Sequence, residues 1–250
     1  MHPAPDRSLT GFPRGFHEVD ALRSEFVRRL LVAERAEDDP PGTSAGIPKV
    51  LVRFWDRADA VPPDVRECLD SWNPLREEGF DVLTFDDASA AAHIRRTGSP
   101  RHMEAFARCH HPAMRSDLFR LFYLFSSGGF YVDADDAMTE GDWPILYGNG
   151  RLKLQPLSFD IPSQTLVEVA GFWRFDRPRP DRLYYVNNNP LVAPAGHPVL
   201  RRALERATDA LLGATGPVEI QATTGPGNLT VALVEHAHER ALAGLPPDYE

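Results

Sequence analysis

Two aspartates, Asp133 and Asp135, end a short apolar run that follows the glycine pair Gly128-Gly129. Side chains along a strand alternate with a period of two, so both carboxylates are expected on the same side. Neighbouring carboxylates repel each other unless a cation or a proton lies between them. Oxygen ligands of this type suit Mg²⁺ or Mn²⁺, which commonly bind one or two carboxylates together with substrate phosphates. The pattern predicts a metal-dependent enzyme acting on a diphosphate-bearing substrate; an acidic loop at a strand end is the alternative for these two residues alone.

Two further groups of polar residues lie close by in the sequence. Asp136 extends the acidic cluster, but on a regular strand it points the other way, so it is expected at the surface. Upstream, Asp117 and Arg120 are three residues apart on an expected helix and therefore share one of its faces.

The composition fits one α/β domain, or such a domain with a helical appendage. The chain has 250 residues, of which 42% are hydrophobic, enough for a full core. No apolar run approaches the ~20 residues that span a bilayer, and the first residues do not resemble a secretory signal. The two cysteines, Cys68 and Cys109, offer neither a disulfide framework nor a Cys-x-x-Cys metal pattern. We therefore expect a cytoplasmic protein with no membrane span.

Charge and spacing exclude other classes. The formal net charge of −9 argues against nucleic acid as a partner, because phosphate binding needs a basic face. Neither His110-His111 nor the pair His236 and His238 has the cysteine or carboxylate spacing of a zinc site. Histidines two apart on a helix diverge, so surface or internally satisfied histidines are expected there.

The first half of the chain alternates strands and helices. Apolar residues at helical spacing predict a helix over 16–37, followed by a linker over 38–46. Strands are predicted over 49–55 and 80–85 and after the glycine pair. Helices are predicted over 62–72, 86–95, 102–109 and 113–125. This alternation is typical of an open α/β sheet, which binds ligands beyond the carboxyl ends of its strands, where Asp133 and Asp135 fall.

The second half is less regular. Strand-like runs extend over 152–175, and one strand carrying Asn187-Asn188-Asn189 is predicted over 183–193. A helix is predicted over 197–212, a turn over 223–228 and a final helix over 229–243.

These residues resemble the glycosyltransferase family whose sugar-binding region carries a DXD motif. That family includes α-1,6-mannosyltransferases and α-1,4-glycosyltransferases, and it is distantly similar to the glucosyltransferase domains of bacterial toxins. Residues 113–135 resemble its core signature, A-x-x-S-D-x-x-R-x-x-x-L-x-x-x-G-G-x-Y-x-D-x-D. Shorter matches within residues 47–230 are Ile47-Pro48-Lys49-Val50 with Phe54-Trp55, a helix ending in Ser71-Trp72, Phe85-Asp86-Asp87, Asn188 with Gly196-His197-Pro198, and Thr224-Gly225-Pro226.

The resemblance implies a GT-A fold, which is a nucleotide-binding mixed α/β sheet flanked by helices. Here that sheet would follow an N-terminal helical extension, with residues 1–46 as helix and linker and residues 47–250 as the glycosyltransferase domain. It further implies a nucleotide-sugar donor (a UDP- or GDP-sugar), Mn²⁺ or Mg²⁺ as cofactor, and transfer with retention of anomeric configuration. The acceptor is not specified.

The resemblance also gives roles to the charged residues. Asp135 would ligate the metal directly, and Asp133 would contact the donor ribose or metal-bound water. Asp117 would accept hydrogen bonds from donor-sugar hydroxyls, and Arg120 would contact the sugar or the diphosphate. The alternative for Asp117 and Arg120 is an internal ion pair that only holds the helix. The catalytic set expected from the resemblance is Asp117, Asp133 and Asp135.

Two aromatic residues are further candidates for donor binding. Trp55 would stack near the nucleobase by resemblance, although buried aromatics at strand ends are often core. Tyr131 points away from the two aspartates on a regular strand, and it could contact the nucleotide or pack in the core with its hydroxyl bonded.

The remaining candidates lie near the C-terminal motifs. Asn188, Asn189 and His197 could reach the donor or the acceptor, although asparagine-rich turns also form for backbone reasons. Thr224 and Gly225 could present a hydroxyl or a backbone group to the diphosphate, or simply form the entry turn of a helix.

Two alternative functions remain open. A degenerate transferase would hold a nucleotide-sugar without turning it over. A phosphatase of the haloacid-dehalogenase type also places Asp-x-Asp at a strand end, but that chemistry would want the motif on the first strand and Thr or Val where this chain has Ala137.

Overall fold

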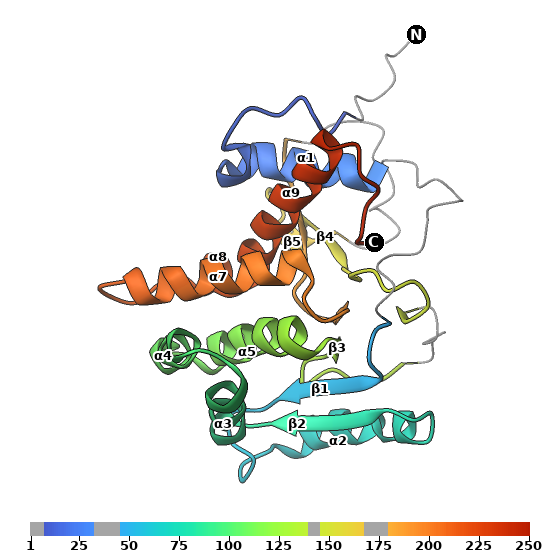
Figure 1. Cartoon of the computed structure of the whole chain (residues 1–250), viewed down its shortest axis with the longest axis vertical. Coiled ribbons are helices and arrows are strands. Elements are labelled where there is room, and N and C mark those ends of the chain that lie inside the picture. The colour runs from blue at the N-terminus through green and yellow to red at the C-terminus, as the bar shows by residue number, and fades with distance from the viewer. Residues whose placement is uncertain (1–7, 33–45, 140–145, 168–179) are drawn as a thin grey trace.

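The structure is a computed structural model that describes residues 8–32, 46–139, 146–167 and 180–250. Its main sheet has four strands in the order β2-β1-β3-β7. The parallel strands are β1 (Val50–Phe54), β2 (Asp81–Phe85) and β3 (Gly129–Tyr131), and β7 (Leu191–Ala193) runs antiparallel to β3. The three strands predicted in the first half of the chain and the mixed α/β class are therefore confirmed (Figure 1).

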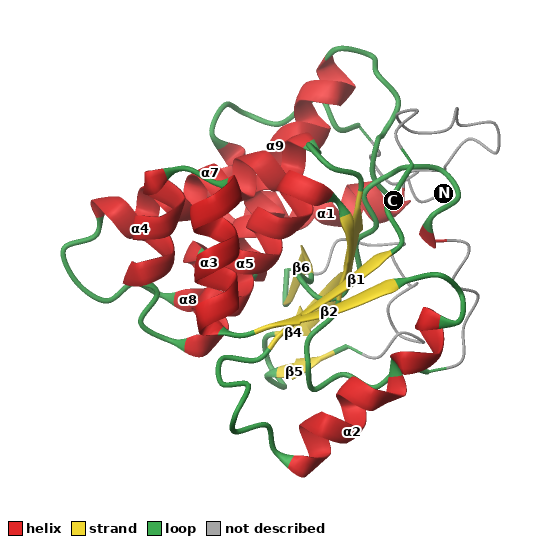
Figure 2. Ribbon diagram, turned by 60° about the horizontal axis from the view of Figure 1, so that its bottom comes forward, coloured by secondary structure: helices red, strands yellow, loops and turns green. Residues whose placement is uncertain are grey.

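Helices cover both faces of this sheet, as the alternation of side chains along β1 requires. Leu51 packs in the cluster that includes Trp72, whereas its neighbour Val52 packs in the larger core with Leu118 and Phe119. Figure 2 shows α2 (Pro63–Ser71) on one side of the strands and α3 (Asp87–Thr97), α4 (Pro100–Arg108) and α5 (Pro112–Ser127) on the other. Each of these helices was predicted, with ends that differ by a few residues.

The first residues of these helices explain where they begin. Asp86 and Ser99 accept hydrogen bonds from backbone N–H groups of α3 and α4 and form capping boxes. Proline stands in the first turn of α2, α4 and α5, where its missing N–H has no cost.

A second helical layer packs on α5. It consists of α7 (Pro198–Gly213), α8 (Ile220–Thr223) and α9 (Pro226–Leu242). The apolar stripe predicted for 197–212 is the buried face of α7, and it includes Leu200, Leu204 and Leu211. The last predicted helix begins three residues earlier than expected, because Gly225 caps α9 and Pro226 opens it.

A small antiparallel sheet, in the order β5-β4-β6, supports the N-terminal helix. Its strands are β4 (Pro156–Asp160), β5 (Thr165–Leu166) and β6 (Arg182–Val186). A 3-10 turn, η1 (Phe16–Glu18), leads into α1 (Asp20–Val32), which packs against β6 and α9. The helix therefore starts later than predicted. Its predicted end, and the predicted linker over 38–46 except for Gly46, lie outside the described residues. The boundary between two domains at residue 46 stays a prediction.

The single strand predicted over 183–193 is wrong. The structure has two strands there, β6 and β7, which belong to different sheets. Residues 187–190 separate them, and Pro190, which follows a cis peptide bond, has no N–H to continue a ladder. The break turns Asn187, Asn188 and Asn189 into a loop beside β3. The strand-like runs predicted over 152–175 form β4 and β5 as far as residue 167, and the remainder is outside the described residues.

The described helices include none that is long and apolar enough to cross a bilayer.

The glycine pair between α5 and β3 is required by the backbone. Gly128 has φ 69° and ψ −174°, a region that only glycine adopts readily, and Gly129 has φ 116°. A Cβ on Gly128 would lie 2.7 Å from the backbone nitrogen of Ala195, and one on Gly129 would lie 2.7 Å from the carbonyl oxygen of Val50. The pair therefore lets α5 end directly against the sheet.

We predict that Gly128→Ala destabilises the fold by roughly 3 kcal/mol or more, because backbone strain and overpacking add. Gly196→Ala is the matched control, since Gly196 has a similar φ of 75° but open space around its Cβ position. That control should cost only about 1–2 kcal/mol. Urea unfolding of both variants measures the difference, and equal losses would contradict the role given to crowding at Gly128.

Candidate active site

The DXD residues form a turn after β3 rather than a continuation of the strand. The strand ends at Tyr131, and the N–H of Asp136 donates to the carbonyl oxygen of Asp133 at 3.2 Å. The strand alternation from which we placed Asp133 and Asp135 on one side therefore does not extend to them, and that premise was wrong. Asp133 is half-buried, whereas Asp135 and Asp136 are exposed, as expected for Asp136.

Arg120 is the centre of a polar network next to this turn. Its guanidinium is buried, with 4% of the side chain exposed. Nη2 lies 2.7 Å from Asp133 Oδ1 and 3.3 Å from Asp117 Oδ1. Nη1 donates to the carbonyl oxygen of Asn188 at 2.6 Å. Arg120 thus joins α5, the DXD turn and the loop between β6 and β7.

Asp117 joins the same network to the start of the last helical pair. Its Oδ1 accepts from Asn188 Nδ2 at 2.8 Å, and its Oδ2 accepts from Thr224 Oγ1 at 3.1 Å. Thr224 is fully buried and ends α8, just before the first turn of α9. Asn188 and Thr224, which belong to two separate sequence motifs, therefore both bond the carboxylate of Asp117.

The two aromatic candidates differ in their surroundings. Tyr131 is fully buried, with Arg120 Cζ 4.4 Å from its ring centroid. Its hydroxyl lies 2.7 Å from Ser116 Oγ, which also accepts from Arg120 Nη2 at 3.2 Å. The structure thus places Tyr131 in the core beneath the network. Trp55 is half-buried just beyond β1, and no described contact joins it to these residues.

Ser116 belongs to this network but received no role from the sequence. The signal was present, because Ser116 lies four residues before Arg120 and therefore on the same helical face. Gly225, in contrast, lies beside Thr224 as the cap of α9, and it has no side chain to contribute.

Burial and like charge govern the titration of the site. Burial alone would lower the pKa of Arg120, but the surrounding oxygens, including those of Asp133 and Asp117, raise it, so the guanidinium stays charged. Burial raises the pKa of Asp133; Arg120 opposes this, while the charges of Asp117, Asp135 and Asp136 add to it. The carboxylates around Asp133 thus outnumber the single arginine, and a bound cation would offset their excess negative charge.

The donor atoms at the turn fit a hard divalent cation. Asp133 uses Oδ1 for Arg120, and Asp135 makes no hydrogen bond or ion pair with any part of the chain that the structure describes. Carboxylate oxygens are among the ligands that Mg²⁺ and Mn²⁺ prefer. Asp135 could therefore hold such an ion without breaking an existing contact, and Asp133 could reach it or its water.

One part of the chain matches a glycosyltransferase family. Residues 62–144, from the start of α2 to beyond the DXD turn, match the family described as "Glycosyltransferase sugar-binding region containing DXD motif". This match and the fold support one class, a DXD glycosyltransferase, and so confirm the prediction from the sequence.

Among solved structures, the chain is similar in fold to the PaToxG glycosyltransferase. The identity is 14% and the TM-score 0.54, and the comparison covers 91% of this chain and 83% of that chain. This likeness extends over most of the chain and supports the GT-A-type fold. No curated protein sequence matches the chain.

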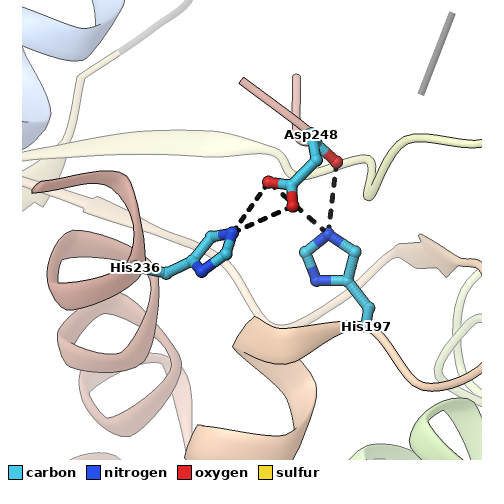
Figure 3. A group of neighbouring side chains, drawn as sticks. All are labelled: His197, His236 and Asp248. Carbon is cyan, nitrogen blue, oxygen red and sulfur yellow. Dashed lines mark hydrogen bonds and ion pairs between the residues drawn. The ribbon is translucent and has the colours of Figure 1, made fainter. Parts of the chain in front are cut away.

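A second cluster of titratable residues, the C-terminal clamp, consists of His197, His236 and Asp248 (Figure 3). His236 Nε2 lies 2.8 and 3.0 Å from the two carboxylate oxygens of Asp248, and His197 Nε2 lies 3.2 Å from the Asp248 carbonyl oxygen. The clamp fastens residues 248–250, which pair with Leu152, to α7 and α9. No described hydrogen bond or ion pair links the clamp to the DXD turn. The contact between His197 and Asp248 was not predicted from the sequence.

The clamp is hydrogen-bonded rather than arranged for a metal. The ligand atoms lie within 4.8 Å of one another, but Nδ1 of His197 accepts the N–H of Val199 at 3.3 Å. The proton of the neutral ring is therefore on Nε2, and a metal there would force a proton onto Nδ1, against that N–H. His238 points away from His236 toward Phe16, as expected for histidines two apart.

Burial lowers the pKa of His197 from 6.5 to about 4, so the ring stays neutral in the folded protein. The unfolded chain takes up a proton near pH 6.5. The stability due to the neutral ring is therefore complete above that pH and is lost as the pH falls toward 4.

We predict that His197→Asn flattens this acid dependence. Asparagine is also a good N-cap, so α7 keeps its first-turn hydrogen bond while the titrating ring is removed. Between pH 7 and pH 4, wild type should lose up to roughly 3 kcal/mol more unfolding free energy than the variant. Urea unfolding across this range measures it, and parallel curves for the two proteins would contradict the assignment.

Proposed function

We propose that this protein transfers a sugar from a nucleotide-diphosphate donor to an acceptor, with Mn²⁺ or Mg²⁺, and with retention of anomeric configuration. The observation that carries the proposal is the convergence of five polar residues beside a turn in which Asp135 has no partner among the described residues. These residues are Asp117, Arg120, Asp133, Asn188 and Thr224. A UDP- or GDP-sugar is the proposed donor, and a cytoplasmic location stays a prediction.

Asp117 is proposed to bind the donor sugar. An ionised carboxylate has about four acceptor positions. Asn188 and Thr224 donate hydrogen bonds to two of them, and Arg120 Nη2 forms an ion pair with Oδ1 at 3.3 Å. We assign a remaining acceptor position to a sugar hydroxyl. The three protein partners fix the carboxylate plane, so that this position has a defined direction.

Arg120 and Asp133 are proposed to hold the shape and charge of the donor site. Arg120 is too buried to serve as a freely moving clamp, since its two Nη nitrogens already bond Asp133, Asn188 and Ser116. Its positive charge offsets part of the negative charge of the two neighbouring carboxylates. Asp133 then offers its second oxygen to the ribose or to a metal-bound water.

Asp135 is proposed to hold the metal, together with the donor diphosphate. A bound divalent ion supplies Lewis-acid stabilisation of the charge on the departing nucleoside diphosphate. The chain itself supplies the exposed carboxylate on a turn of fixed shape. Trp55, beyond the end of β1, remains the candidate for the nucleobase contact, since ligands of such sheets bind beyond the carboxyl ends of their strands.

The donor and the metal can be identified by thermal shift with UDP-, GDP- and dTDP-sugars, each with Mn²⁺, Mg²⁺ or EDTA. A ligand at ~100 times its dissociation constant adds roughly 2.7 kcal/mol of stability. We predict stabilisation by one nucleotide-sugar only when metal is present. Stabilisation without any sugar transfer or donor hydrolysis would instead indicate a degenerate, donor-binding protein.

We predict that Asp135→Asn lowers the transfer rate at least about a hundredfold, as expected when one group that stabilises developing charge is lost. The fold should be unaffected, because Asp135 is exposed and uncommitted among the described residues. Asp209→Asn is the control, since Asp209 lies in an exposed ion pair with Arg101 and should leave the rate unchanged. Normal turnover by the Asp135 variant would contradict the proposed role.

A further inference from the structure

The end of α2 contacts the chain just after the DXD residues. The indole Nε1–H of Trp72 donates to the carbonyl oxygen of Asp136 at 2.7 Å. The hydroxyl of Ser71 accepts from the N–H of Met138 at 2.8 Å and donates to the carbonyl oxygen of Cys68 at 2.6 Å. Neither residue received a role from the sequence, although the pair forms the Ser-Trp ending of that helix.

Asn189 holds the same turn from the other side. Its Oδ1 accepts from the N–H of Asp133 at 2.9 Å, and its Nδ2 donates to Asp136 Oδ2 at 2.7 Å. Its own carbonyl oxygen accepts from the side-chain amide of Asn187. One amide group therefore bridges the two ends of the four-residue turn that contains Asp135.

Trp72 is itself fixed on the strand that leads into the turn. Only 3% of the residue is exposed. Its ring packs edge-on against Phe130 of β3, with centroids 5.6 Å apart. The donor of the hydrogen bond to Asp136 thus belongs to the same rigid core cluster as the strand, rather than to a mobile surface side chain.

We propose that Ser71, Trp72 and Asn189 are positioning residues, which fix the backbone of residues 133–138 and so direct the Asp135 carboxylate toward the metal. The inference rests on the proposed function of Asp135. It also changes the role expected for Asn189, because its side-chain amide hydrogen-bonds to Asp133 and Asp136 instead of to the donor.

The physical reason is that a ligand held in one orientation binds a metal more tightly than one that must be ordered first. Asp135 itself has no described partner, so its direction is set by the backbone on either side of it. Removing a group that orients a metal ligand typically weakens metal binding about 10–100-fold. Here the hydrogen bonds to the backbone of residues 133, 136 and 138 provide that orientation.

Trp72→Phe tests the inference most cleanly, because it removes the N–H donor and keeps an aromatic ring in the core. Mn²⁺ binding is measured by the EPR signal of free Mn²⁺ in the presence of UDP, and separately of GDP. The KM for Mn²⁺ and kcat are measured in parallel. Tyr147→Phe is the matched control, since its hydroxyl is buried in the same cluster without a partner among the described residues.

We expect Trp72→Phe and Asn189→Ala each to weaken Mn²⁺ binding about tenfold. The KM for Mn²⁺ should rise by the same factor, and excess Mn²⁺ should restore kcat. Tyr147→Phe should bind Mn²⁺ as wild type does. Asn189→Ala keeps the inference testable if Trp72→Phe does not fold, because Asn189 lies in a loop and not in the core.

Unchanged Mn²⁺ affinity in both variants, with active wild type, would overturn the positioning role and leave the proposed function standing. A fall in kcat that excess Mn²⁺ does not restore, with unchanged Mn²⁺ affinity, would also overturn it. If wild type neither binds Mn²⁺ nor transfers sugar, the proposed function fails, and this inference fails with it.

Discussion

The candidate site depends on one buried cation, the guanidinium of Arg120. Placing a charge in a protein interior is costly unless the charge is paired and hydrogen-bonded. Arg120 meets this condition with Asp133, Asp117 and the carbonyl oxygen of Asn188, which come from three separate parts of the chain. Any rearrangement that removed one of them would leave the buried charge less well compensated, which favours the meeting of the three segments.

The fold provides the geometry for this meeting. The glycine pair ends α5 against the sheet, so that β3 returns beside it and the DXD turn follows within a few residues. The break between β6 and β7 places the asparagine loop next to that turn, and the end of α8 brings Thr224 onto Asp117. The site is therefore built from fixed elements, and only the carboxylate of Asp135 is left without a contact among the described residues.

Much of this could be predicted from the sequence, because its signals are local. Helix caps, apolar periodicity and the glycine break gave the elements, and the spacing of Asp117 and Arg120 put them on one helical face. The resemblance then supplied the class, which the comparisons support. These signals describe what a segment does on its own, and they do not say which segments meet.

Contacts between segments far apart in the chain could not be predicted from the sequence. Nothing local shows that the indole of Trp72 reaches Asp136, or that His197 pairs with Asp248. The single strand predicted over 183–193 failed for a local reason that was overlooked, since Pro190 cannot continue a ladder. Conversely, Tyr131 is a core residue supporting Arg120, a role that alternation along β3 left open.

The proposed metal site is tested most directly by a crystal structure of the protein with Mn²⁺ and the nucleoside diphosphate that binds best, using the anomalous signal of manganese to locate the metal. We predict one manganese peak at the Asp135 carboxylate, between that residue and the diphosphate, with Arg120 still bound to Asp117 and Asp133. A manganese peak at His197, His236 and Asp248, or a diphosphate bound away from the DXD turn, would contradict it.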